Sequence, residues 1–213
     1  MHFTADYVES VVLKDGSKVR LRLLTPEDKP LLSAGFAKLS PKSRYARFLG
    51  PKTSLEDHEL RYLTEVDQQD HFALGVIPEE GEPIGLGIAR FIRLPDGTSA
   101  EAAIVVSDEM QGRGLGRLLL LRLCAAAAER GVERFRCEVL GSNTAMTALL
   151  SQISPERTIE VEGGVMTIDL PLPNVTPSEP PVENSKGSVF EMLRAAAQDL
   201  VEWTESIRRL WWG

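Results

Sequence analysis

A run of three alternating glycines, between a strand pattern and a helix pattern, constrains this chain more than any other feature. The residues before it, 99–107, are mainly small and β-branched, those after it, 117–130, are rich in Leu and Ala, and the run itself is Gln111-Gly112-Arg113-Gly114-Leu115-Gly116. Glycine lets backbone N–H groups turn inward without a Cβ in the way. The start of the helix adds further N–H groups and the positive end of its dipole. The segment therefore predicts a cradle for phosphate oxygens.

Two other interpretations of the glycine run are open. A dinucleotide-binding unit also uses a glycine turn, but near the start of a parallel βαβ unit and with an acid at the end of the next strand. Here the upstream strands have the pattern of an antiparallel meander, and Glu138 lies inside its strand. The second is a tight turn without a ligand, for which three glycines at a helix start are costly. Phosphate binding, with Arg113 and Arg117 as added donors, is the favoured interpretation.

The hydrophobic periodicity up to residue 170 predicts an α+β fold with α/β/α layers and a mostly antiparallel sheet. Alternating apolar and basic residues predict a strand at 17–24, and an Asp-Gly turn separates it from a short strand at 11–13. Further strands are expected at 71–77, 83–93, 99–107, 135–140, 158–161 and 165–170. Helices are expected to open at Thr25, at Ser40 and at 53–57, with Glu56 in a capping box, and to run over 117–130 and from 142 to about 152.

The composition changes at Pro171, which predicts three parts in the chain. Residues 1–170 form the main domain, residues 171–187 a Pro-rich linker, and residues 188–213 a C-terminal amphipathic helix. The apolar residues of this helix follow a heptad spacing, which is typical of packing against another helix. The helix could therefore fold back on its own domain, form a homodimer with a second copy, or lie on a membrane surface.

Four segments resemble a known family. The glycine run resembles the pyrophosphate loop of the GNAT N-acetyltransferases, written Gln/Arg-x-x-Gly-x-Gly/Ala, and residues 100–106 resemble the central strand of that fold. Within the family, the segments Ser40–Phe48 and Val66–Leu74 are similar to those of bacterial Pat-type protein lysine acetyltransferases. The resemblance covers roughly residues 10–170 and implies a mixed sheet that is splayed at the acyl-CoA site.

The resemblance also implies where acetyl-CoA, the acyl donor, would bind. The pantetheine would pair with backbone groups of Ile104, Val105 and Val106, and an N–H near Val105 would polarise the thioester carbonyl. Asn143, at the start of the next helix, matches a family position that contacts the cofactor. The pyrophosphate would lie on Gln111, Gly112, Arg113, Gly114, Leu115, Gly116 and Arg117.

The reaction needs a base, because a lysine amine with a pKa of about 10.4 is protonated at neutral pH. Glu101 is the predicted base, since it lies on the cofactor-bearing strand and matches an acid of related enzymes. Asp67, Asp70 and His71 are weaker candidates. Many relatives carry a tyrosine that protonates the leaving thiolate, and Leu150 stands in its place here. A thiolate with a pKa of about 8.5 can leave without that acid.

Other candidate groups have simpler interpretations. Cys124 and Cys137 are expected to be small core residues rather than nucleophiles. Arg44 and Arg47 could meet an acidic substrate or the phosphates of coenzyme A, or form a solvated helix face. No metal site is expected.

The sequence thus predicts an N-acetyltransferase that acts on a protein lysine or a small amine by direct attack. The alternative is a catalytically weak or inactive acyl-CoA-binding sensor or interaction module. A net charge of −7 argues against a nucleic-acid partner. No apolar run reaches the about 20 residues that span a membrane, and the two cysteines and the absence of a signal pattern favour a cytoplasmic location.

Overall fold

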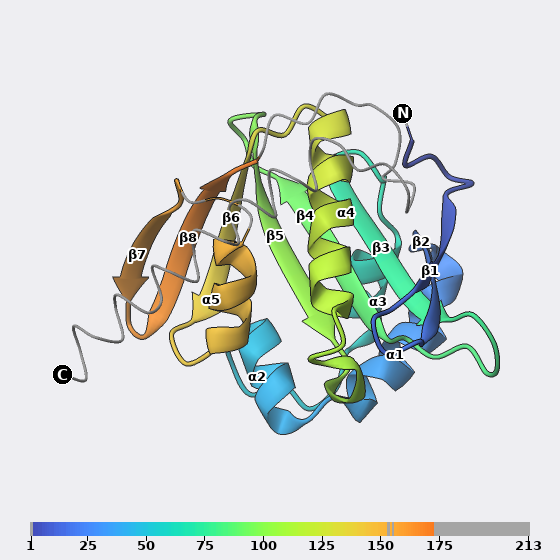
Figure 1. The fold of residues 1–213 in the computed structure, drawn as a ribbon. Helices are drawn as coiled ribbons and strands as arrows, with labels where there is room; N and C mark the ends of the chain where they lie inside the picture. Colours follow the sequence, from blue (N-terminus) through green and yellow to red (C-terminus); the bar gives the residue numbers. More distant parts are fainter. Residues whose placement is uncertain (1, 153, 155, 173–213) are drawn as a thin grey trace.

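One mixed sheet organises the part of the chain that the computed structural model describes, residues 2–152, 154 and 156–172. Its eight strands follow the order β1-β2-β3-β4-β5-β6-β8-β7 (Figure 1), and only the β5–β6 pair is parallel. The strands are β1 (Val8–Val12), β2 (Lys18–Leu23), β3 (His71–Pro78), β4 (Gly87–Arg93), β5 (Ser99–Val106), β6 (Arg134–Leu140), β7 (Thr158–Glu162) and β8 (Val165–Pro171). This confirms the expected α+β fold. The predicted linker, most of it past residue 172, and the predicted terminal helix lie outside the described residues.

Helices cover both faces of the sheet. Helix α4 (Leu115–Glu129) crosses β4 and β5 on the face toward the viewer in Figure 1. The other face is bordered by α1 (Lys29–Lys38), α2 (Pro41–Phe48) and α3 (Asp57–Thr64). The remaining elements are α5 (Thr144–Ser151) and two short 3-10 turns, η1 (Pro26–Asp28) and η2 (Asp108–Met110).

The core lies between α4 and the sheet. Leu115, Leu119 and Leu123 recur every four residues and are fully buried, so one stripe of α4 faces the strands. A Cβ built on Gly87 would lie 3.0 Å from Leu119 Cδ1 and 3.1 Å from Val105 O. The glycine at this position of β4 therefore permits the close approach of helix and strand that its sequence position suggested.

Three of the expected boundaries were wrong. The strand expected at 83–93 begins at Gly87, because Pro83 has no N–H and Gly85 lies under α1, whose Gly35 would place a Cβ 3.4 Å from Gly85 O. The third helix begins at Asp57, with Glu56 as its N-cap and Glu59 as the capping-box acid. The first strand, expected at 11–13, spans Val8 to Val12. The first helix opens at Thr25 as expected, with Thr25 as the N-cap and Pro26 at the first position of η1, and Asp28 of this turn is buried against Arg22.

Candidate active site

The strands β5 and β6 separate soon after they meet. Their pairing covers only Ser99 to Glu101 opposite Arg134 to Arg136, although β5 continues to Val106 and β6 to Leu140. At the point of separation the Cys137 thiol meets the backbone of Ala102. Beyond it, residues 103–106 have no ladder pairing with β6. An extended ligand could pair with this free strand edge, so the splayed sheet that the resemblance implied is present.

The glycine loop lies where β5 passes into α4. Gly112 and Gly114 have φ angles of 75° and 92°, which L side chains rarely adopt, and Gly114 is the N-cap of α4. A Cβ added at either would meet nothing within 4 Å, so open space lies in front of both. Gly116 instead packs between Val106 and Leu149 of α5. The positive φ values therefore shape a cradle that the protein itself leaves open.

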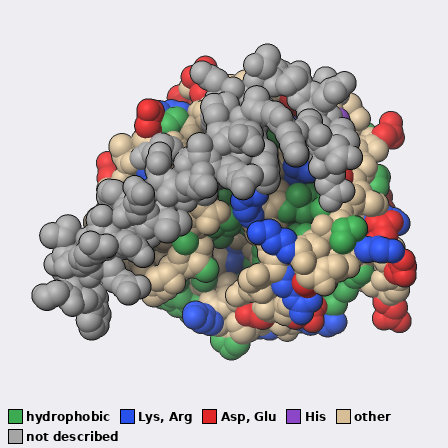
Figure 2. Space-filling view, viewed as in Figure 1, with side chains coloured by type: hydrophobic (Ala, Val, Ile, Leu, Met, Phe, Trp, Pro, Cys, Tyr) green, Lys and Arg blue, Asp and Glu red, His purple; other side chains and the backbone are tan. Residues whose placement is uncertain are grey.

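Most polar side chains predicted around the loop have protein partners. The Gln111 amide donates to Val106 O and Ser43 Oγ, at 3.4 and 3.3 Å, and Arg113 pairs with Asp15 at 3.1 Å. Asn143 caps α5, since its Oδ1 accepts from Met146 N at 3.1 Å. The exposed Arg113 could exchange its surface ion pair for a phosphate at little cost. Lys and Arg side chains gather near the middle of the face shown in Figure 2, the face that α4 covers.

Asp108, the first residue of η2, joins the end of β5 to α2. Its Oδ2 accepts from Ser40 N at 2.8 Å, and its Oδ1 accepts from Ser40 Oγ and Ser43 Oγ at 2.8 and 2.7 Å. Burial opposes ionisation, but these donors hold the pKa of Asp108 below its ordinary value. The start of α2 is thereby fixed to the end of β5.

Glu101 points away from α4. Ala100, Ala102 and Ile104 are buried on the α4 side of β5, and the alternation of a strand places Glu101, Ala103 and Val105 on the opposite face. Glu101 is exposed, and among the described residues no side chain forms an ion pair or hydrogen bond with it. A solvated carboxylate with no fixed partner is free to accept a proton from a ligand.

Two adjoining pockets lie on the Glu101 face. One is mostly apolar and runs between the sheet and helices α1 and α2. It includes Ser107, whose buried hydroxyl has no hydrogen-bond partner among the described residues. The other includes Glu101, Tyr62 and Glu59. Arg47, Phe48, Leu63, Arg90 and Ala103 line both. The space beside Glu101 can therefore receive a second substrate.

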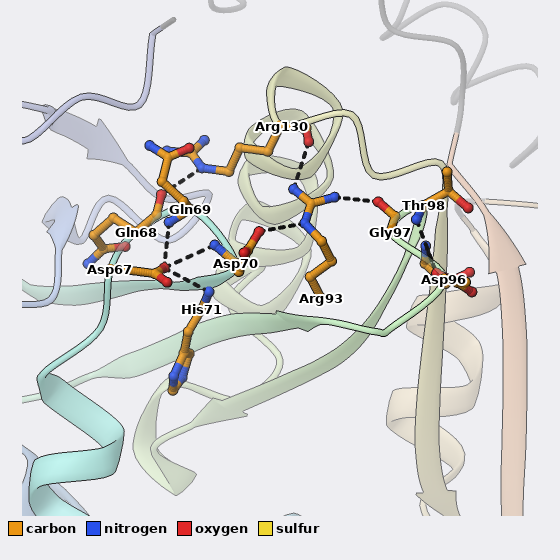
Figure 3. Close-up of polar contacts among 11 residues, drawn as sticks. Asp67, Gln68, Gln69, Asp70, His71, Arg93, Asp96, Gly97, Thr98 and Arg130 are labelled. Atoms are coloured by element: carbon orange, nitrogen blue, oxygen red, sulfur yellow. Dashed lines mark hydrogen bonds and ion pairs between the residues drawn. The ribbon is translucent and has the colours of Figure 1, made fainter.

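The weaker candidates for the base hold the loop before β3 (Figure 3). Asp67 Oδ1 accepts from the backbone N–H groups of Gln69, Asp70 and His71 at 2.8 to 2.9 Å, and these bonds outweigh burial and lower its pKa. Asp70 pairs with Arg93 at 2.6 Å. Burial and the charge of Arg90 lower the pKa of His71 to about 4. Asp67 and Asp70 are therefore bound to backbone N–H groups and to Arg93, and His71 is neutral at pH 7.

The apolar and thiol positions agree with their sequence interpretation. Cys124 and Cys137 are buried, and burial raises the pKa of Cys124 and raises that of Cys137 to about 12, so both stay protonated at neutral pH. Leu150 is 1% exposed and belongs to the core. Sequence reasoning missed Arg90, Tyr62 and Asp108. A charged residue inside the apolar run of β4 was the signal that could have identified Arg90.

Two classes of site find no support in the described residues. No helix among them is both apolar enough and long enough to cross a bilayer. No cluster of three His, Cys, Asp or Glu side chains in that part of the chain could bind a metal ion.

A splayed mixed sheet with an open glycine loop beside the split is the arrangement that the resemblance to the GNAT acetyltransferases implied. A family model described as the acetyltransferase (GNAT) family matches residues 41–152. Acetyltransferase Pat of Mycolicibacterium smegmatis is 32% identical over 194 residues, which cover 88% of this chain and 57% of that relative. Acetyltransferase PA5475 of Pseudomonas aeruginosa is 31% identical over 144 residues, or 67% of this chain and 76% of the relative.

A solved structure agrees with the two relatives. The GNAT domain of S. lividans PAT superposes with a TM-score of 0.72 at 29% identity, covering 80% of this chain and 99% of that domain. The chain belongs to the acetyltransferase (GNAT) family. It spans little more than half the length of the M. smegmatis relative.

Proposed function

We propose that this protein transfers the acetyl group of acetyl-CoA to a primary amine by direct attack, with Glu101 as the general base. The amine belongs to a protein lysine or to a small molecule. The observation that carries the proposal is the position of Glu101. It stands where β5 and β6 part and faces a pocket on the side of the sheet opposite α4.

In this proposal, three groups of residues bind the cofactor, polarise the thioester carbonyl and remove the proton of the amine. Acetyl-CoA supplies a thioester whose carbonyl carbon a neutral amine can attack. The backbone of residues 104–106 would hold the pantetheine, and the N–H groups of residues 111–116, with Arg113 and Arg117, would hold the diphosphate. The amide of Asn143 would contact the cofactor. An N–H near Val105 would stabilise the charge that develops on the carbonyl oxygen.

Glu101 would remove a proton from the incoming ammonium, directly or through a water molecule. The thiolate then leaves without a protein acid, because Leu150 carries no proton to give. A thiolate with a pKa of about 8.5 is a moderate leaving group. After it has left, it can take a proton from solvent.

The test is the substitution Glu101→Gln, which keeps shape and removes the base. Release of free coenzyme A should fall by about 10²- to 10⁴-fold, while calorimetric binding of acetyl-CoA stays as in wild type. The matched control is Glu160→Gln, on the exposed edge strand β7, which should leave both unchanged. Full activity in Glu101→Gln would reject the role of this residue.

The second candidate is a non-catalytic acyl-CoA-binding module, and the buried Leu150 at the tyrosine position favours it. It predicts calorimetric binding of acetyl-CoA without coenzyme A release in a screen of amines that includes lysine peptides, amino acids and polyamines. Release with any acceptor, above the rate of hydrolysis, would exclude it.

A further inference from the structure

The pocket that contains Glu101, called the acceptor pocket below, includes two arginines that form no ion pair with a carboxylate among the described residues. Arg47, near the end of α2, lies over the ring of Phe48 at 5.1 Å, and among the described residues nothing forms a hydrogen bond or ion pair with it. Arg90 of β4 is 5% exposed. Its Nη2 donates to Leu63 O at 2.9 Å, and its Nη1 lies 3.2 Å from His71 Nε2. Both guanidinium groups line the pocket that contains Glu101.

The two groups also destabilise each other's charge. Burial, with the nearby charge of Arg47, lowers the pKa of Arg90 to about 9. Burial lowers the pKa of Arg47 as well, and Glu101 opposes that shift. The neutral His71 beside Arg90 cannot compensate. Arg47 is thus half-buried and Arg90 is buried, and too little negative charge lies around the two guanidinium groups.

Other arginines that pack against this sheet are paired. Arg22 binds Asp28 at 2.5 Å, and Arg122 binds Glu9 at 2.5 Å. In the acceptor pocket the second acid, Glu59, already pairs with Lys52 at 2.6 Å. When the neutral Glu59–Lys52 pair is set aside, two cations, Arg47 and Arg90, face the single carboxylate of Glu101. The charges of these three side chains sum to +1. Burying a cation without an anion is unfavourable, so the pocket calls for an anionic ligand group.

We propose that Arg47 and Arg90 form a carboxylate subsite, so that the preferred acceptor carries a carboxylate close to its reacting amine. The amine meets Glu101 and the carboxylate meets the fork of Arg47, with Arg90 behind it. This inference rests on the proposed function, because it uses Glu101 as the group that receives the amine. An amine arrives as a cation, and a purely cationic acceptor would add to the excess of positive charge, whereas an acceptor with both charges balances it.

The experiment compares acceptors that differ only in this charge. One arm uses γ-aminobutyrate against its amide, and the other uses a capped peptide with Asp beside its single lysine against the same peptide with Asn. We expect the carboxylate to raise kcat/KM by about ten-fold or more in at least one arm, which equals about 1.4 kcal/mol. The arm that shows the preference identifies a free amino acid or an acidic protein segment as the source.

Variants then assign the preference to the arginine. Arg47→Gln should reduce the carboxylate-to-amide ratio to near one, and Arg47→Lys should restore part of it. The control Arg61→Gln, at an exposed position of α3 outside the pocket, should keep the wild-type ratio. A wild-type ratio of one in both arms, or a ratio that survives in Arg47→Gln, would overturn the proposal.

Binding without turnover separates this proposal from the proposed function. The N-acetylated forms of the same acceptors are titrated into the full chain in the presence of coenzyme A. The carboxylate forms should bind at least about ten-fold more tightly than the amides, and Arg47→Gln should abolish the difference. If no acceptor is acetylated, the proposed function fails while this measurement still decides the subsite. Equal binding of both forms would reject it.

Discussion

At the scale of single residues, the surroundings of each ionisable group determine its role. Asp67 and Asp70 have fixed backbone or arginine partners in the loop before β3. Glu101 has none among the described residues and faces a pocket, so of these three carboxylates it is the one that lies open to a ligand. The side-chain type alone does not separate these groups, because all are carboxylates at strand ends or within strands.

His71 should make the stability of the protein depend on pH. Its folded pKa of about 4 lies below the ordinary value of 6.5, so between these values the unfolded chain binds more protons. Stability should therefore fall as the pH drops from 7 to 5, by about 1–2 kcal/mol from this group. Urea unfolding of His71→Gln should show a shallower decline than wild type. The exposed His58→Gln should not, and an identical decline in His71→Gln would contradict the assigned pKa.

At the scale of elements, two short segments hold helix α2 by hydrogen bonds to its first turn. Asp108 ties the start of α2 to the end of β5, and Gln111 reaches from the glycine loop to Ser43 of the same helix. The other end of α2 carries Arg47 and Phe48 into the acceptor pocket. Helix α2 therefore connects the glycine loop at one end to the pocket that contains Glu101 at the other.

Asp108→Ala should loosen this helix. The loss of three hydrogen bonds to a carboxylate should lower the free energy of unfolding by about 1–3 kcal/mol, and the KM for the acceptor should rise more than that for acetyl-CoA. The neighbouring residue Glu109 is exposed and its side chain forms no hydrogen bond or ion pair with the described residues, so Glu109→Ala is the control. Unchanged stability and kinetics in Asp108→Ala would show that the hydrogen bonds do not hold α2.

Gly114→Glu should abolish acetyl-CoA binding, because it fills the open cradle with a negative charge. Gly81 has the same φ of 92° and equally open space, but it lies in the loop between β3 and β4. Gly81→Glu therefore introduces the same backbone strain and charge, at a cost of about 1 kcal/mol in stability, and should bind acetyl-CoA normally. Calorimetry on both variants checks this. Equal affinity in both would mean that the diphosphate binds elsewhere.

At the scale of the whole molecule, a row of aromatic rings crosses the sheet beside the point where it splits. Phe72 and Phe91 stack at 5.3 Å between ring centres, and Phe91 reaches Phe135 of β6 at 6.1 Å. The small residues Ala100 and Ala102 of β5 lie between them in the register and leave room for this contact. The closed end of the sheet is therefore packed tightly while the other end stays open.

Phe91→Ala should destabilise the fold strongly. Phe91 is fully buried, and its truncation should lower the free energy of unfolding by about 3–5 kcal/mol through the loss of burial and the cavity left behind. Chemical denaturation measures the change. Val161→Ala, at a side chain that is 69% exposed, should change stability by less than about 0.5 kcal/mol. A small effect at Phe91 would mean that the row does not anchor the sheet.

Periodicity and turn chemistry predicted most elements correctly. Gly114, Gly131 and the Gly163–Gly164 turn all adopt the positive φ values that their positions imply. The predicted start of β4 was wrong because a distant segment packs there: Gly85 lies against Gly35 of α1, and the strand begins only at Gly87. The domain limits, the terminal helix and a homodimer remain predictions, since they depend on residues beyond 172.

The sequence by itself determined the strand–glycine–helix segment and the sheet class, because local backbone preferences and side-chain alternation act over a few residues. The role of Glu101 as the base stays a prediction. Only the tertiary structure decided which charges meet. Asp108 lies 68 residues from Ser40 along the chain, and Arg47 and Arg90 come from α2 and β4. Pairing between such distant segments depends on how the elements pack, and packing also left two arginines facing a single free carboxylate.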